Sequence, residues 1–151
     1  MHIFSIFTYG TLEIPAVMEA VTGKVFESAA ALADGYARYL LKGKVYPGIT
    51  PLAGQTTSGR VYFNVSQEAV TLLDRFEDNI YVPQVITVRT DSGQRHNAYA
   101  YIIEPKDQGV LSMNPWIRET FIETSLNSYL EACRQFHSTY CRALSSGISI
   151  G

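Results

Sequence analysis

Glycine and proline punctuate the first two thirds of this chain at short intervals. The runs between them are short, which predicts many short strands and few helices over this part. The boundary positions are Gly23, Gly35, Gly43, Pro47, Gly48, Gly54, Gly59, Gly93 and Pro105. Beyond Pro105, apolar residues recur at helical spacing from Trp116 to about Tyr140. This pattern favours an α+β fold, with a small mixed sheet or barrel and helices on its outside.

Local signals place the individual elements. Helices are expected at 15–22, between Pro15 and the stop at Gly23, and at 67–76, behind the N-cap Ser66. Expected strands cover 3–8, 29–41, 59–65, 81–89 and 96–103, with a turn at 46–48. Asn114 and Pro115 predict the start of one long helix or two. With 151 residues, 46% of them hydrophobic, residues 1–151 are expected to form a single domain, of which about 105–151 is a helical extension.

Charge and composition exclude several classes of protein. Only 17% of the residues are charged and the net charge is -2, so the sequence lacks the excess of basic residues that nucleic-acid binding needs. No apolar run reaches the length of a membrane span. The start, MHIFSIF, has no Lys or Arg, and no cleavage site of the secretory kind follows it. The two cysteines form no disulfide framework. We therefore expect a cytoplasmic protein that binds neither nucleic acid nor membrane.

The apolar strand at 3–8 ends abruptly in Tyr9-Gly10-Thr11-Leu12. A glycine there permits a turn that leaves the amides of Gly10, Thr11 and Leu12 without strand partners. Successive free amides make an anion-binding concavity, and the helix expected at Pro15 adds its positive end. The alternative is a plain turn between strand and helix.

One acid of the stretch EAVTLLDRFED is expected to face inward. Glu77 follows Leu73 by four residues and so continues the apolar stripe of the helix, whereas Asp74 and Asp78 fall on the wetter side. Burial would raise the pKa of Glu77 toward the range useful for proton transfer. The alternative is that the helix ends at Phe76 and that Glu77 turns into water.

Cys133, His137 and Cys141 share one helical face, at spacings of four residues. They could be zinc ligands or a Cys–His nucleophile pair, but they also continue the apolar stripe, which small buried cysteines explain better. No phosphate-binding loop, dinucleotide fingerprint, zinc-protease motif or nucleophile elbow occurs. The residues alone therefore predict no metal site.

Several stretches, in order and spacing, resemble the gamma-glutamylcyclotransferase-like family, in the branch of small gamma-glutamylamine cyclotransferases and plant avirulence-induced-gene proteins. They cover roughly the first two thirds of the chain. The stretches are FTYGTL at 7–12, VTGK at 21–24, LADGYARYLLKGKVYPGITP at 32–51, SGRVYFNVS at 58–66 and LLDRFEDNIY at 72–81, followed by VITV and AYAYI.

The resemblance implies a compact barrel with flanking helices and a cavity at one side. In it, the amides of the turn Tyr9, Gly10, Thr11 and Leu12 would hold the gamma-glutamyl group, and Glu77 would be the catalytic base and acid. Tyr81 and, less directly, Tyr46 would line the pocket. The implied reaction releases 5-oxoproline and an amine or amino acid, and it needs no metal or organic cofactor. The expected partner is the small gamma-glutamyl substrate, bound by a monomer or homodimer.

Two positions depart from the family's pattern. Asp78 stands where the family commonly has glycine, and Pro83 stands where an arginine is frequent. A second carboxylate beside Glu77 would raise the pKa of Glu77 or misdirect it, and loss of the arginine removes an ion-pair partner. These departures motivate an alternative, in which the chain is a non-catalytic small-molecule-binding or regulatory domain of the same fold.

Overall fold

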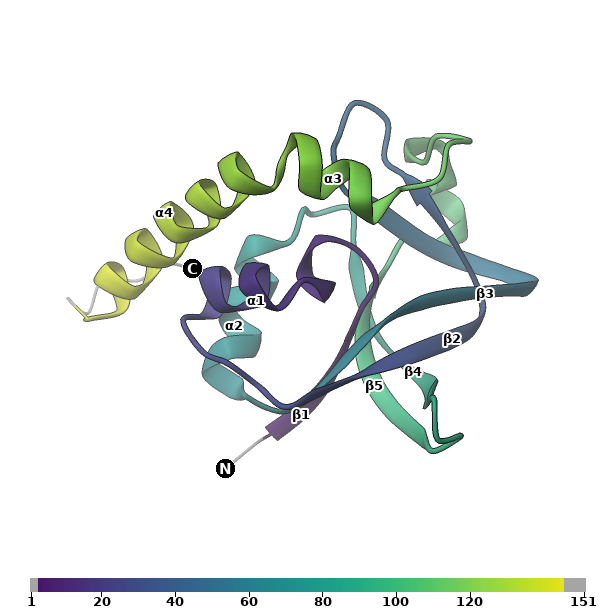
Figure 1. Ribbon diagram of the computed structural model, residues 1–151, viewed down its shortest axis with the longest axis horizontal. Coiled ribbons are helices and arrows are strands. Elements are labelled where there is room, and N and C mark those ends of the chain that lie inside the picture. The colour runs from purple at the N-terminus through teal and green to yellow at the C-terminus, as the bar shows by residue number, and fades with distance from the viewer. Residues whose placement is uncertain (1–2, 146–151) are drawn as a thin grey trace.

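The computed structural model describes residues 3–145, in which five strands form one mixed sheet with helices beside it (Figure 1). The strands are β1 Ile3–Thr8, β2 Ser28–Leu40, β3 Pro47–Ser66, β4 Val82–Thr90 and β5 Arg95–Ile102. The helices are α1 Pro15–Thr22, α2 Gln67–Phe76, α3 Arg118–Thr124 and α4 Leu126–Ser145, with short 3-10 helices η1 Thr11–Glu13 and η2 Pro105–Val110. The predicted α+β class is confirmed.

The sheet closes on itself in the order β1-β3-β2-β4-β5. Most neighbours are antiparallel, and β5 returns to β1 through a parallel pairing at Ile6 and Tyr99. Apolar residues of β1 and β3 are buried on both faces of the sheet, Ile6 on one face and Phe7 and Val61 on the other. In Figure 1, α1 and α2 lie between the sheet and α4, and α4 packs along α1. No helix within residues 3–145 is long and apolar enough to cross a membrane.

The predicted turn at 46–48 is wrong, because β3 already begins at Pro47 and continues to Ser66. The glycines and proline that suggested breaks lie inside this strand instead. Asp34 pairs with Thr56 but Tyr36 pairs with Pro51, so residues 52–55 bulge out of the β2–β3 pair. A bulge accommodates glycine and proline without ending the strand, so these residues did not mark the strand ends correctly here.

The C-terminal helical segment is two helices, separated at Ser125. The predicted start at Asn114 and Pro115 is wrong, since α3 begins at Arg118. The backbone before it is tied to β2 and the turn that follows, which prevents helical hydrogen bonding there. Leu40 N–H donates to Asn114 O at 2.9 Å, and the Trp116 indole N–H donates to Val45 O at 2.9 Å.

Candidate active site

The turn after β1 approaches the start of β3 so closely that only glycine fits at position 10. A Cβ on Gly10 would lie 2.6 Å from Cδ and 2.7 Å from Cγ of Pro47. Contacts this short do not occur between real carbon atoms, and the proline ring has little freedom to move away. Close approach to Pro47 is therefore the structural reason for Gly10.

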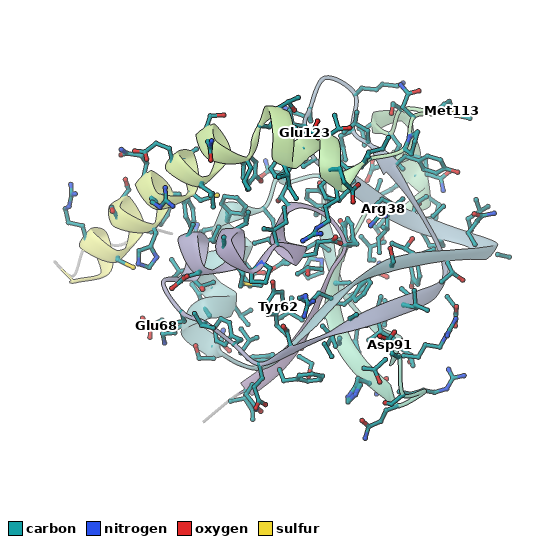
Figure 2. The ribbon with its side chains drawn as sticks, in the orientation of Figure 1. Arg38, Tyr62, Glu68, Asp91, Met113 and Glu123 are labelled. Carbon is teal, nitrogen blue, oxygen red and sulfur yellow. The ribbon has the colours of Figure 1, made fainter. Side chains whose placement is uncertain are left out.

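Each carbonyl oxygen of residues 9–12 accepts a hydrogen bond from another residue of the chain. The acceptor and donor pairs are Tyr9 O with Arg38 Nη1 at 2.7 Å, Gly10 O with Glu13 N at 3.0 Å, Thr11 O with Ile14 N at 3.2 Å, and Leu12 O with the Tyr62 hydroxyl at 2.8 Å. In a trans peptide, C=O and the next N–H point in opposite directions. The amides of Gly10, Thr11 and Leu12 thus point the other way, and they have no partner within residues 3–145. Figure 2 labels the two side-chain donors, Arg38 and Tyr62.

These amides border a cavity of about 280 Å³. Ten of the lining residues are buried: Phe7, Thr8, Tyr9, Gly10, Thr11, Leu12, Pro47, Tyr81, Tyr101 and Cys133. The other six are more accessible: Tyr46, Phe76, Glu77, Asp78, Tyr129 and Ala132. The structure therefore brings all seven residues singled out in the sequence, Tyr9, Gly10, Thr11, Leu12, Tyr46, Glu77 and Tyr81, around one space. A cavity of this size holds a small molecule.

Glu77 reaches this cavity by a different route from the one that the sequence predicts. The helix α2 ends at Phe76, and Glu77 is its C-cap, with an extended backbone and its N–H bonded to Leu73 O at 2.9 Å. The expectation that Glu77 continues the helical stripe is therefore wrong. The alternative is right that the helix ends at Phe76, but wrong that Glu77 turns into water, because its side chain is partly buried at the cavity wall.

The surroundings of Glu77 favour its neutral form. Burial, followed by the like charges of Asp78 and Asp74, raises the pKa of Glu77 to about 8. Among the described side chains that line the cavity none is Lys or Arg, so no cation of theirs offsets this rise in pKa. A carboxyl group in this state exchanges its proton near neutral pH, as a general acid or base must.

Asp78 is closer to the cavity than expected. It is exposed, as predicted, but it also lines the cavity, so the prediction that Glu77 alone of these acids faces the site is wrong. Its backbone follows Glu77 out of the helix, which removes the helical geometry that would have separated the two carboxylates. The Tyr46 hydroxyl lies 3.4 Å from Asp78 Oδ2 and donates to it. Asp74 is exposed and accepts a hydrogen bond of 2.6 Å from Tyr101.

Buried tyrosines line the cavity without offering an ionisable group. Tyr9 donates to Tyr101 O and Tyr81 donates to Pro47 O, each at 2.6 Å. Burial raises the pKa of both phenols far above the ordinary value, so they remain neutral hydrogen-bond donors. Their hydroxyls are committed to backbone carbonyls and fix the cavity wall.

Sequence reasoning did not assign nine residues of the wall to the site: Phe7, Thr8, Pro47, Phe76, Asp78, Tyr101, Tyr129, Ala132 and Cys133. Tyr129 and Cys133 lie on the apolar stripe predicted for the C-terminal helix, so their inward orientation was in the pattern. Their contact with the turn was not, since nothing local indicates that α4 meets residues more than a hundred positions earlier. Thr11 Oγ1 donates to the Tyr129 hydroxyl at 3.1 Å across that distance.

The contacts of Cys133, His137 and Cys141 agree with a structural role for this cluster. Within residues 3–145, no group of three or more Cys, His, Asp or Glu side chains could hold a metal ion. Cys141 Sγ lies 3.7 Å from Nδ1 and 3.4 Å from Nε2 of His137, and a thiol in line with one ring nitrogen would be much farther from the other. His137 Nδ1 instead bonds Val21 O at 2.9 Å, and burial raises the pKa of the Cys133 thiol to about 12.

Comparison with known proteins confirms the resemblance seen in the sequence. The model of the family described as gamma-glutamyl cyclotransferase, AIG2-like, matches residues 6–118. AIG2-like protein D of Arabidopsis thaliana is 29% identical over 138 residues, which cover 90% of this chain and 89% of that relative.

Solved structures show the same fold. A solution structure of an Arabidopsis thaliana protein has a TM-score of 0.68 and 24% identity, and covers 99% of this chain and 90% of its own. A gamma-glutamyl cyclotransferase has a TM-score of 0.57 and 16% identity, and covers 88% of this chain and 87% of its own. At these identities the likeness is one of architecture, and the chemistry must be argued from the site.

Proposed function

Because this chain belongs to the gamma-glutamyl cyclotransferase, AIG2-like family, we propose that it is an enzyme that cyclises gamma-glutamyl compounds. One observation carries the proposal: a carboxyl group with a pKa of about 8 borders the same cavity as three backbone amides that have no hydrogen-bond partner among the described residues. In the reaction, the substrate's α-amino nitrogen bonds to its γ-carbonyl carbon. The bond from that carbon to the amide nitrogen breaks, giving 5-oxoproline and a free amine or amino acid.

Glu77 moves the protons of this reaction. An α-amino group has a pKa of about 8, so Glu77 and the substrate's amino group compete for a proton on nearly equal terms. The carboxylate accepts a proton from the attacking nitrogen, and the resulting carboxylic acid donates one to the leaving nitrogen. Every proton lost by the attacking nitrogen appears on the leaving amine, so the step balances without a metal or organic cofactor.

The turn at residues 9–12 supplies position and electrostatics. Its three free amides can bind the γ-carbonyl oxygen and stabilise the negative charge that develops there during attack. Their direction is fixed before substrate arrives, because the carbonyls of the turn are already bonded elsewhere. Holding a flexible substrate curled for internal attack can supply about 7–11 kcal/mol of the barrier reduction.

The test is a mass-spectrometric screen for 5-oxoproline. Purified protein is incubated with gamma-glutamyl amines, gamma-glutamyl amino acids and glutathione, beside a protein-free blank and the variant Glu77→Gln. Product from the wild type, with none above the blank from a folded Glu77→Gln, is the expected result. Equal product from both proteins would remove Glu77 from the mechanism.

A binding domain without turnover is the second candidate function. It is favoured by the absence of basic side chains among the residues that line the cavity, and by Pro83 at the position where the resemblance places an arginine. Without a cation beside it, the raised pKa of Glu77 favours its neutral form at neutral pH. This candidate predicts that gamma-glutamyl ligands raise the melting temperature of the wild type while the screen yields no 5-oxoproline.

A further inference from the structure

Part of the cavity wall comes from beyond the segment that the family model matches. That match ends at residue 118, yet α4 contributes Tyr129, Ala132 and Cys133 to the cavity. The helix therefore does more than cover the core: it completes the space in which the substrate would lie.

Several contacts hold α4 in a defined position over the site. Tyr129 accepts the hydrogen bond from Thr11, and its ring meets Phe76 edge-on, with centroids 6.2 Å apart and an interplanar angle of 87°. Two turns further along, His137 is bonded to Val21 O at the end of α1. Because α4 is anchored to the turn, to α2 and to α1, its side chains present a fixed wall.

The cavity has a direction from a buried end to an accessible mouth. The turn at 9–12 is buried, whereas Tyr46, Phe76, Asp78, Tyr129 and Ala132 are partly or fully exposed, and the part of the cavity that these five residues line is called its mouth. On the function proposed above, the gamma-glutamyl group binds the amides at the buried end. The leaving amine must then extend past Glu77 and out through the mouth.

We propose that Ala132 determines which leaving groups this enzyme accepts, an inference that rests on the proposed cyclotransferase function. Ala132 is exposed and has the smallest side chain of the five that frame the mouth. Its methyl group takes up little of the space in this part of the cavity, which leaves room for an extended alkyl or aryl chain on the leaving amine. Any longer side chain at 132 reduces that room without disturbing the core.

The first test compares short and long leaving groups. The substrates are the gamma-glutamyl amides of methylamine and n-pentylamine, and the variant is Ala132→Phe. We expect the ratio of kcat/KM for the pentylamide to kcat/KM for the methylamide to fall at least tenfold below that of the wild type. Ser138→Phe, an exposed position of α4 that does not line the cavity, is the matched control and should change neither value. An unchanged ratio between the two substrates in Ala132→Phe would overturn the inference.

The second test changes the charge of the side chain at position 132. The pentylamide and the 4-aminobutylamide have nearly the same shape, but the second ends in an ammonium group. In Ala132→Asp, a carboxylate at the mouth attracts that group, since opposite charges about 4 Å apart interact favourably even near water. We expect the ratio of kcat/KM to shift at least fivefold toward the aminobutylamide. No shift would place Ala132 outside the path of the leaving group.

A binding measurement separates this inference from the proposed function. Calorimetry with the pentylamide and the Glu77→Gln variant measures Kd without turnover, and this Kd includes the contacts at the mouth. A rise of at least fivefold in Kd on adding Ala132→Phe supports the inference, even where the wild type forms no product. An unchanged Kd overturns it, whereas absence of 5-oxoproline from every substrate overturns only the proposed function.

Discussion

Arg38 donates a hydrogen bond of 2.7 Å to the carbonyl oxygen of Tyr9, from the side of the turn opposite to its free amides. Arg38 also donates to Ser58 O at 2.9 Å and lies over the Trp116 ring, 5.5 Å from its centroid. It therefore couples β2, β3 and the segment before α3 to the turn. The direction of the amide of Gly10 is set by a residue that does not line the cavity.

The first prediction concerns this positioning role. Arg38→Met removes the donor to Tyr9 O and should lower kcat/KM at least tenfold, because the peptide that follows Tyr9 is free to rotate. Arg38→Lys keeps a donor and should recover part of the loss. Steady-state kinetics with the best substrate of the screen provides the measurement.

A structural contribution of Arg38 has to be separated from the positioning role. Glu13 Oε1 lies 3.4 Å from Arg118, while its Oε2 lies 3.8 Å from Arg38 and has no hydrogen-bond partner within residues 3–145. Loss of Arg38 leaves this carboxylate less compensated, at a cost of roughly 1–3 kcal/mol. The double variant Arg38→Met with Glu13→Gln should recover stability but not activity. Recovery of both would show that Arg38 acts only through stability.

The second prediction concerns the contact between Gly10 and Pro47. Gly10→Ala forces a carbon atom to within 2.6 Å of the proline ring unless the turn moves. We expect a loss of about 1–3 kcal/mol in the free energy of unfolding, measured by urea denaturation, together with reduced kcat/KM. Gly109→Ala is the control, since nothing lies within 4 Å of its Cβ. Equal stabilities of the two variants would contradict the structure of the turn.

The elements of this fold could be predicted where local signals decide them. The strand 3–8 and the helices 15–22 and 67–76 have the predicted bounds, because an apolar run, Pro15 and Ser66 act within a few residues. Bounds fixed by distant partners could not be predicted. The start of α3 depends on hydrogen bonds from residues 114 and 116 to the region of residues 40–45, and no local pattern encodes them.

The candidate site shows the same division. The stretch YGTL and the acid Glu77 stood out in the sequence by motif and spacing. The outward bonds that orient the turn come from Arg38 and Tyr62, which are 29 and 50 positions away from their acceptors, and the mouth is completed by α4. Such contacts arise from packing of the whole chain, and sequence periodicity describes only which face of an element is buried.

The third prediction is that Glu77→Gln stabilises the protein at alkaline pH. The pKa of Glu77 is raised from 4.5 to about 8 in the folded state, so the unfolded chain ionises first as pH rises. Below about pH 4.5 this group therefore does not lower the free energy of unfolding of the wild type. As pH rises from about 4.5 to about 8, the free energy of unfolding falls. A glutamine at position 77 does not ionise, so the free energy of unfolding of the variant does not fall for this reason.

Thermal or urea melts between pH 4 and 9 measure this effect. The two proteins should be similar at pH 4, and the variant should be more stable above pH 8, by at most roughly 5 kcal/mol. Water in the cavity will make the difference smaller. Glu123→Gln on the surface of α3 (Figure 2) is the control and should show no growing difference. A gap that is constant across the pH range would mean that Glu77 titrates normally.

The last prediction is that Asp78 sets the acid limb of the pH–activity profile. The productive complex holds one proton between Glu77 and the substrate's amino group, so kcat/KM should rise with pH up to about 8, the pKa of Glu77. Asp78→Asn removes the like charge that, after burial, contributes most to this pKa. The limb should then move to lower pH and kcat/KM at pH 6 should rise roughly threefold.

Asparagine can still accept the hydrogen bond from Tyr46, so the geometry is kept. Asp91→Asn, at the exposed hairpin between β4 and β5 (Figure 2), is the matched control and should leave the profile unchanged. If the limb stays in place in Asp78→Asn, then the group that titrates in the free enzyme is not Glu77.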